Sequence, residues 1–343
     1  MKKLMHLLPG VLYASVIAIA SVYLGRLVPL LGAPLFGILL GALIGNLVGM
    51  PARVEAGARF TSKRVLQWSI ILIGSSLSLR QVFAVGSSSF AVMIGTLAVA
   101  FAAALLIGKG LGIPAKMTVL IGAGTGICGG SAIAAVSPII EAEEVEIAYA
   151  MSTIFLFNVV AVLLFPAIGH LLGFSSTSFG LWAGTAINDT SSVVAAGYAY
   201  SNAAGDYATI VKLTRTTMIV PISLMLAAFM ALRLRRSGPV TDRTPGSEQG
   251  PRPATRTLLR VFPWFILGFL ATSLINTLHL LPVPVLNAAA SAGRFLIVMA
   301  LAAVGLNANL KKMVQAGFRP ILLGLGVWAS VALSSLAIQR LVG

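Results

Sequence analysis

Two short stretches of this chain place small, hydroxylated and charged residues inside apolar sequence. Residues 121–136 read IGAGTGICGGSAIAAV and residues 181–196 read LWAGTAINDTSSVVAA, and the two align without a gap over several identical positions. The glycines disfavour a continuous helix, since each costs about 1 kcal/mol relative to alanine. Paired, interrupted apolar helices are typical of a transporter's binding site. Chance similarity between two closely packed Gly/Ala-rich membrane helices is the alternative.

The polar groups at the two breaks predict a binding site for a small oxyanion. Backbone N–H groups and hydroxyls at a helix N-terminus bind sulfate or carboxylate groups without a fixed countercharge. Cys128, within the first break, is interpreted as a small packing residue rather than a nucleophile. The predicted substrate-binding residues are Thr125, Gly126, Cys128, Gly129, Gly130 and Ser131 in the first break, Thr185, Asn188, Asp189, Thr190, Ser191 and Ser192 in the second, and Lys212 and Arg215 in the segment that follows.

Asp189 is the acidic residue that lies deepest in an apolar segment. A carboxylate there costs several kcal/mol unless it is paired or faces water, which predicts a functional role. We expect Asp189 to bind the coupling ion, H⁺ or Na⁺. Asn158, in the middle of the 146–172 segment, either supports this site or bonds between helices. For Asp189, a structural ion pair with Lys212 or Arg215 is the alternative. These two cations share a helix face by their spacing, and they could either attract an anionic substrate or extend to the membrane interface.

Composition predicts an all-α polytopic membrane protein. Of 343 residues, 58% are hydrophobic and 10% are charged. Apolar runs of about 20 residues, each long enough to cross a bilayer, recur along the chain. The net charge of +15 does not indicate nucleic-acid binding, because the basic residues lie between the apolar runs, as they do in cytoplasmic loops. One cysteine and three scattered histidines predict no disulfide, no metal site, no cofactor and no catalytic cluster, and therefore no enzyme.

The whole chain, residues 1–343, is expected to form a single transporter domain with a cytoplasmic N-terminus. Residues 1–30 are predicted to form an extra, uncleaved N-terminal helix. Residues 233–260, rich in Arg, Pro and Gly, are predicted to be a cytoplasmic linker. Apolar segments are predicted at residues 10–28, 34–50, 65–86, 90–111, 116–140, 146–172, 178–200, 208–232, 261–280, 288–308 and 318–341.

A second internal similarity predicts inverted repeats. Residues 63–86 align without a gap with residues 294–317, with Gly74 opposite Gly305. The two segments lie an odd number of spans apart, so they cross the membrane in opposite directions, as in many secondary transporters. The predicted units are a first half at 31–172, a second broken-helix unit at 173–232, and an inverted repeat of 31–111 at 261–343.

Two topologies remain open for the interrupted segments. If residues 116–140 and 178–200 each enter and return as a re-entrant hairpin, the chain has nine spans plus two hairpins. This arrangement makes every repeat pair antiparallel and is preferred, with the irregular backbone at the tips buried in protein or facing a wet cavity. If both segments cross fully, the chain has eleven spans. The loop Glu141–Glu146 distinguishes the two, because it is cytoplasmic in the hairpin topology and external in the other.

The motifs GTGICGGSAI, LFNVVAVLLFP, FGLWAGTAINDTSSVVAAG and KLTR together resemble the YeiH-type family of sulfate exporters over nearly the whole chain. The resemblance implies a secondary transporter of the bacterial inner membrane, with sulfate or an organosulfonate as exported substrate and a homodimer as assembly. The wider grouping is similar to cation/proton antiporters and bile-acid symporters, whose crossed broken helices favour the eleven-span alternative. Asp189, Lys212 and Arg215 match the family pattern. Asn188 replaces a histidine common there, which argues against a His-based proton relay.

The sequence therefore predicts a secondary active transporter that moves a small anion across the lipid bilayer by alternating access. The main alternative is a cation/proton exchanger in which Asp189 binds the cation directly. A channel or a membrane-embedded enzyme fits less well, because inverted repeats favour a carrier and the sequence has no recognisable catalytic cluster.

Overall fold

The computed structural model describes residues 6–28, 32–236, 264–308 and 317–342, and every regular element in these ranges is a helix. Within them, six helical stretches are long and apolar enough to cross a membrane. These are α2 (Leu8–Leu27), α6 (Leu79–Gly110), α9 (Glu144–Leu171), α12 (Asn202–Thr217) continued by α13 (Ile219–Arg236), α16 (Val283–Asn307) and α18 (Phe318–Val342). The prediction of an all-α polytopic membrane protein is confirmed at this level.

Three further stretches are candidates for the remaining spans. Two are apolar but shorter helices, α3 (Gly32–Leu47) and α15 (Phe265–Thr277). The third is composite: α4 (Ala52–Phe60), a π-helical turn (Thr61–Val65) and α5 (Leu66–Ile73) follow one another without interruption. The nine-span count and the inverted repeat stay predictions. Most of the predicted linker 233–260, beyond Arg236, and residues 309–316 of the predicted repeat lie outside the described residues.

One predicted boundary is wrong, because residues 86–90 do not separate two segments. α6 runs unbroken from Leu79, after the short 3₁₀ turn Gly74–Ser76, and its start is fixed by a capping box between Ser78 and Gln81. Three consecutive serines at 87–89 suggest a loop in the sequence. Their hydroxyls instead donate to backbone carbonyls three residues earlier at 3.0–3.2 Å, which lets them stay in the helix.

The first interrupted segment folds back on itself. It consists of α7 (Ala115–Gly126) and α8 (Gly130–Val136), and the Lys116 ammonium donates to the Glu141 carbonyl at 2.7 Å. A straight helix would separate these residues by roughly 37 Å at 1.5 Å per residue. The segment is therefore a hairpin, called hairpin 1 below, whose base joins the start of α7 to the loop after α8.

The second interrupted segment has the same form. In hairpin 2, α10 (Ser176–Ala186) and α11 (Thr190–Tyr200) meet at their outer ends, where the Ser176 and Ser201 hydroxyls are 2.8 Å apart. The Tyr200 ring stacks on Phe179 with a centroid distance of 4.0 Å. Both interrupted segments thus fold back as hairpins, whereas the eleven-span alternative has each of them cross the membrane fully as an unwound helix. Their depth in a membrane remains a prediction.

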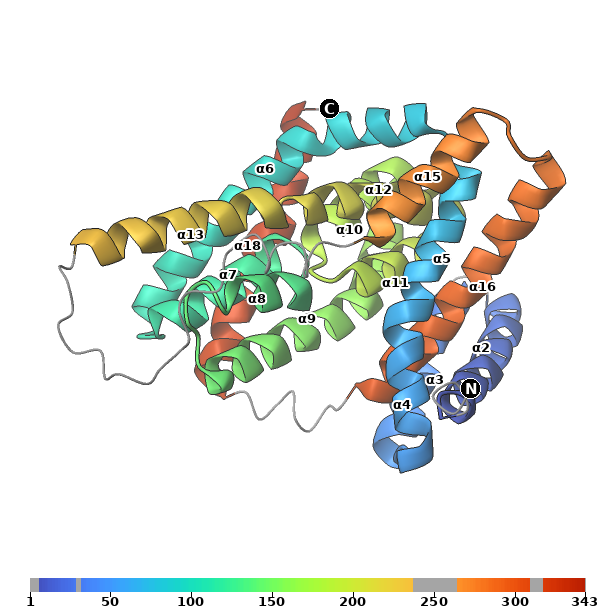
Figure 1. Cartoon of the computed structure of the whole chain (residues 1–343), viewed down its shortest axis with the longest axis horizontal. Coiled ribbons are helices and arrows are strands. Elements are labelled where there is room, and N and C mark those ends of the chain that lie inside the picture. Colours follow the sequence, from blue (N-terminus) through green and yellow to red (C-terminus); the bar gives the residue numbers. More distant parts are fainter. Residues whose placement is uncertain (1–5, 29–31, 237–263, 309–316, 343) are drawn as a thin grey trace.

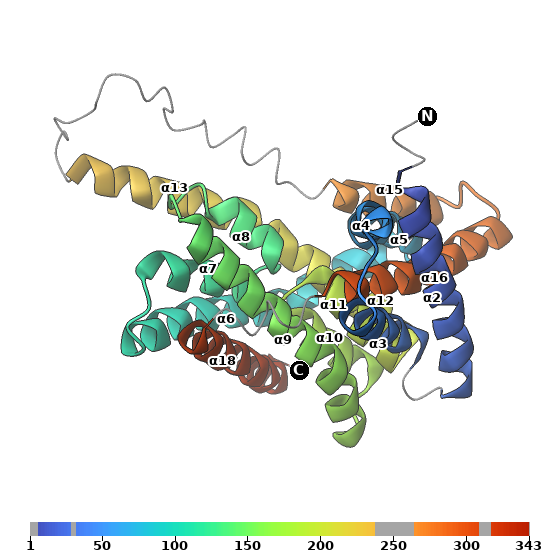
Figure 2. The ribbon, with the colours of Figure 1, turned by 90° about the horizontal axis from the view of Figure 1, so that it is seen from below.

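The helices form two groups that pack against each other. α6 to α13 and α18, called the hairpin bundle, make one group, and α2 to α5 with α15 and α16, called the flanking group, make the other (Figure 1). The groups meet where α3 and α16 contact α11 (Figure 2). The largest buried apolar cluster belongs to the hairpin bundle and includes Leu120, Ile133, Phe165 and Trp182. This core holds both hairpins, so it fixes the position of their tips.

Candidate functional site

The tips of the two hairpins touch each other. Hairpin 1 turns at Ile127–Gly129 and hairpin 2 at Ile187–Asp189. A Cβ built on Gly129 would lie 3.2 Å from the Cβ of Asp189, closer than side chains normally pack. Gly129 also has a φ of +67°, which L side chains rarely adopt. Glycine is thus required here both by the turn and by the opposing tip, and the two predicted breaks form one site.

Two buried cations on α12 join the tips to each other. The Lys212 ammonium donates to the carbonyls of Ile127 at 3.0 Å and Ile187 at 2.8 Å, one from each tip. The Arg215 guanidinium also donates to both hairpins, and both side chains are fully buried. Its acceptors are Gly126 (2.6 Å) and Thr125 (3.5 Å) in hairpin 1 and Thr185 in hairpin 2.

These contacts have a clear electrostatic cause. α7 and α10 both end at the tips, where their last carbonyls lack helical partners and carry the negative end of the helix dipole. Lys212 and Arg215 supply both donors and positive charge at that point. The two cations therefore stabilise the interrupted backbone. Neither forms an ion pair with Asp189, because among the described residues Arg59 with Glu55 is the sole salt bridge. The ion-pair interpretation of Asp189 is not what the structure shows.

Asp189 instead caps a helix. It precedes α11, and its carboxylate accepts hydrogen bonds from the backbone N–H of Ser191 at 3.0 Å and from the Ser191 hydroxyl. Its own backbone N–H donates to the Asn158 side-chain oxygen at 3.2 Å, which ties the tip of hairpin 2 to α9. Asp189 is half-buried while its neighbour Asn188 is buried, so the carboxylate lies at the edge of the enclosed part of the site.

Several buried polar atoms at the tips have no hydrogen-bond partner in the described structure. They are the Thr125 hydroxyl, the Asn158 amide nitrogen and both polar atoms of the Asn188 amide. All three residues are 1–3% exposed. A buried polar group without a partner costs about 1–3 kcal/mol, so a cluster of them calls for an explanation such as a bound ligand. Thr125 and Asn188 belong to opposite tips, and Asn158 faces them from α9.

The other predicted site residues lie around this cluster in different environments. Ser131 is exposed, and Gly130 and Thr190 are half-buried. Met151 and Phe155 of α9 cover Gly130. Ser192 and Cys128 are buried, and Cys128 is a free thiol. The Thr185 hydroxyl is 2.6 Å from that of Ser335 on α18. No sequence pattern indicates this contact, because Ser335 lies in an ordinary apolar helix.

Two cavities lie away from the tips. One, of about 350 Å³, is lined by Ser88, Thr177, Ser178, Tyr207 and Gln339 among others. The other, of about 340 Å³, lies between the two helix groups. Among the described residues no group of three His, Cys, Asp or Glu could hold a metal ion.

Tightly packed helices, two opposed hairpins and membrane-length apolar segments define a polytopic α-helical membrane protein. The sequence profile of the family described as "Conserved hypothetical protein 698" matches residues 9–324. The chain is 41% identical over 336 residues to a UPF0324 membrane protein of Clostridium tetani, covering 97% of both chains. It is 44% identical over 344 residues to one from Streptococcus pyogenes serotype M18, covering 98% of this chain and 97% of the relative. The protein belongs to this family of UPF0324 membrane proteins.

Proposed function

We propose that the protein is a secondary active transporter that moves a small anion by alternating access through a site between the hairpin tips. The observation that carries this proposal is the group of buried, unpartnered polar atoms of Thr125, Asn158 and Asn188, next to two buried cations. Irregular backbone within an apolar protein is tolerated where it lines a ligand site. Opposed hairpins whose tips meet suit a carrier, because the site can be reached from either side by a modest rearrangement.

The charges at the tips favour an anion. Lys212 and Arg215 carry two formal positive charges and Asp189 one formal negative charge, so these three side chains have a formal net charge of 2 − 1 = +1, apart from the dipoles of the helices that end at the tips. Lysine has three N–H donors and arginine has five. The described bonds use two of the Lys212 donors and three of the Arg215 donors. Both side chains therefore keep N–H donors that the described bonds do not use, and we propose that a substrate oxygen accepts from them.

The resemblance of the tip motifs to YeiH-type exporters supports sulfate or an organosulfonate as the substrate and export from a bacterial cell as the direction. Coupling to H⁺ or Na⁺ would pass through Asp189, since it is the carboxylate at the tips and is half-buried. Partial exposure leaves room for an ion or a proton to reach it.

A cation/proton exchanger is the second candidate, and one observation favours it. The Asp189 carboxylate accepts hydrogen bonds only locally, from Ser191, and forms no salt bridge within the described structure. It could therefore bind a cation directly. In that case cation gradients would drive proton movement without any anion.

Transport by the purified protein in liposomes separates these candidates. Vesicles loaded with sulfate or taurine should take up the radiolabelled compound by exchange, and uptake should saturate with concentration. Asp189→Asn should abolish the driving of uptake by a pH or Na⁺ gradient while the protein stays folded. Glu144→Gln, at an exposed position in the first turn of α9, should transport as wild type.

Three other results would contradict the proposal of a coupled anion transporter. Proton flux that depends on cations and needs no anion would establish the exchanger. Wild-type coupled uptake in Asp189→Asn would remove this carboxylate from the mechanism. Flux that does not saturate would indicate a pore.

A further inference from the structure

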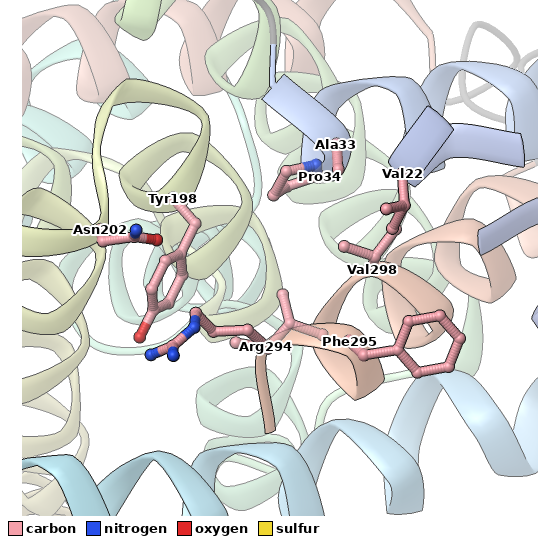
Figure 3. A pocket seen from close by; sticks show the side chains of 9 residues that line it. Val22, Ala33, Pro34, Tyr198, Asn202, Arg294, Phe295 and Val298 are labelled. Atoms are coloured by element: carbon pink, nitrogen blue, oxygen red, sulfur yellow. The ribbon is translucent and has the colours of Figure 1, made fainter. Parts of the chain in front are cut away.

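A cavity of about 340 Å³ lies between the hairpin bundle and the flanking group, beside the buried apolar cluster that the two groups share. Its lining comes from both groups: Tyr198 and Asn202 belong to α11 and α12, and Val22, Ala33, Pro34, Arg294, Phe295, Ile297 and Val298 belong to α2, α3 and α16. Figure 3 shows the Arg294 guanidinium pointing toward the Tyr198 hydroxyl, with Phe295 and Val298 further along the wall.

The polar groups gather at one end of this cavity. Arg294 falls near the middle of α16, a helix long and apolar enough to span a membrane. A cation at such a position is costly unless it is paired or solvated. Its described hydrogen bond is to Ser291 on its own helix at 3.2 Å, and no carboxylate in the described structure lies within 4 Å of it. Asp206 accepts a hydrogen bond from the Tyr198 hydroxyl and is near enough to Arg294 for the two charges to interact, but it does not line the cavity. Arg294 is the charged side chain among the residues that line it.

The rest of the wall is apolar. Val22, Ala33, Pro34, Ile297 and Val298 present hydrocarbon to the interior, and Phe295 is 37% exposed beside them. The cavity volume is at the lower end of the range for small-molecule sites, about 300–1,000 Å³. A guanidinium, a phenol and an amide at one end of an apolar cavity match a molecule with an anionic head and a hydrocarbon chain.

We propose that the cavity between α2, α3, α11, α12 and α16 binds an amphipathic anion, with its carboxylate or phosphate on Arg294 and its hydrocarbon against Val22, Phe295 and Val298. The ligand is either the headgroup of a membrane phospholipid with part of its chain, or a free single-chain anion. In both cases it contacts the two helix groups together. This site is separate from the hairpin tips and does not depend on the transport proposal.

The test is thermal unfolding of the full-length protein purified in dodecyl maltoside, at constant ionic strength. The probes are decanoate, dioleoyl-phosphatidylglycerol, inorganic phosphate as a head without a chain, and decanol as a chain without a charge. A ligand that binds the folded state raises the apparent Tm with saturation. We expect a saturating rise with decanoate, with phosphatidylglycerol or with both, and none with phosphate or decanol. A response to decanoate alone identifies a free single-chain anion, and a response to phosphatidylglycerol alone identifies a membrane lipid.

Variants tie the response to this cavity. Arg294→Met should raise the half-saturating concentration about tenfold or more, the value expected for loss of a charged hydrogen bond. Arg294→Lys keeps the charge and should retain most of the response, which guards against a simple folding defect. Arg340→Met removes an exposed cation at the end of α18 and should respond as wild type. An unchanged response in Arg294→Met, an equal response to phosphate alone, or no response to either amphipathic probe would overturn the proposal.

Discussion

Lys212 and Arg215 show how a membrane protein can accommodate buried cations without carboxylates. Both are fully buried, and their described partners are five backbone carbonyls at the ends of α7 and α10. The ends of two helix dipoles provide the compensating negative charge. The two interpretations offered by the sequence, attraction of an anion and extension to the interface, both omit this structural role. Extension to the interface does not occur, because neither side chain reaches the surface.

Replacing Lys212 by methionine should destabilise the protein strongly. The change keeps the side-chain length but leaves the Ile127 and Ile187 carbonyls without their donor, and each such loss costs about 1–3 kcal/mol. We expect a clear fall in the thermal midpoint measured in detergent. Lys109→Met, at the exposed end of α6, serves as the control and should have little effect. A Lys212→Met protein as stable as wild type would show that the cation does not support the tips.

Replacing Asn188 by alanine should reduce transport without reducing stability. Its amide has no described partner, so its removal should leave the thermal midpoint unchanged or higher. Anion uptake into liposomes should fall by about tenfold or more if the amide binds substrate. Thr153→Val is the matched control, because the Thr153 hydroxyl is also buried and unpartnered but its methyl group packs against Gly324 of α18. Equal uptake by the two variants would remove Asn188 from the site.

Gly129 tests the contact between the tips. Gly129→Ala introduces a Cβ at a positive φ and against Asp189, whereas Gly112→Ala, also at a positive φ, meets open space. The left-handed conformation alone costs about 1–2 kcal/mol for an alanine. We expect Gly129→Ala to lower the thermal midpoint by more than Gly112→Ala. Equal decreases in the thermal midpoint would mean that the tip of hairpin 2 moves to accommodate the added methyl group without any loss of stability.

At the scale of the helices, the hairpins are the feature that sequence reasoning anticipated best. The breaks at 127–129 and 187–189 lie within the predicted stretches, and the preference for hairpins followed from the directions of the repeats. The sequence could not show which residues meet at the hairpin bases. Those contacts, Lys116 with Glu141 and Ser176 with Ser201, depend on a turn whose geometry no local pattern encodes.

The start of α6, in contrast to the hairpins, was predicted at the wrong residues. Glycine and three serines at 86–89 suggest a boundary, because serine competes with the helix by bonding to the backbone. Here the serine hydroxyls bond within the helix, and the preceding Ser78 and Gln81 carry the real start signal. The capping box was readable in the sequence, whereas the tertiary packing that keeps the serines helical was not.

A disulfide across the base of hairpin 2 tests its fold directly. In a Cys128→Ala background, Ser176→Cys with Ser201→Cys should crosslink readily, because the two hydroxyls are 2.8 Å apart. The protein is cleaved with a protease between the two positions and run on a gel without reductant, where a disulfide keeps the two fragments together. Ser176→Cys with Glu141→Cys, which joins the bases of different hairpins, is the control and should not crosslink. If Ser176→Cys and Ser201→Cys form no disulfide, the result would favour the topology in which this segment crosses the membrane fully.

At the scale of the whole molecule, the distribution of basic residues predicts on which side of the membrane the base of hairpin 1 lies. Hairpin 1 begins and ends on one side, since Glu141 lies beside Lys116. If the basic loops lie in the cytoplasm, as the positive-inside rule predicts, the hairpin topology predicts a cytoplasmic position for the acidic stretch Glu141–Glu146 as well. In a Cys128→Ala background, Glu141→Cys should react with an impermeant maleimide in inside-out vesicles and not in intact cells. Labelling of intact cells would contradict the hairpin topology.

The relation between the two helix groups is the part of the molecule that the sequence left open. Apolar periodicity locates each helix, but lipid-facing and protein-facing surfaces are both apolar in a membrane protein, so it does not show which helices pack together. The cavity at Arg294 and the pairing of α6 with α18 therefore emerge only from the structure.

Binding of a small anion at the hairpin tips is measured most directly by ligand-dependent thermal stabilisation of the purified protein. Sulfate, sulfite, taurine and small carboxylates would each be titrated with and without Na⁺ and over a range of pH. We predict a saturating rise in the thermal midpoint with one class of anion, lost in Asn188→Ala and kept in Thr153→Val. A rise with cations alone, or an anion response that both variants keep, would contradict an anion site between the tips.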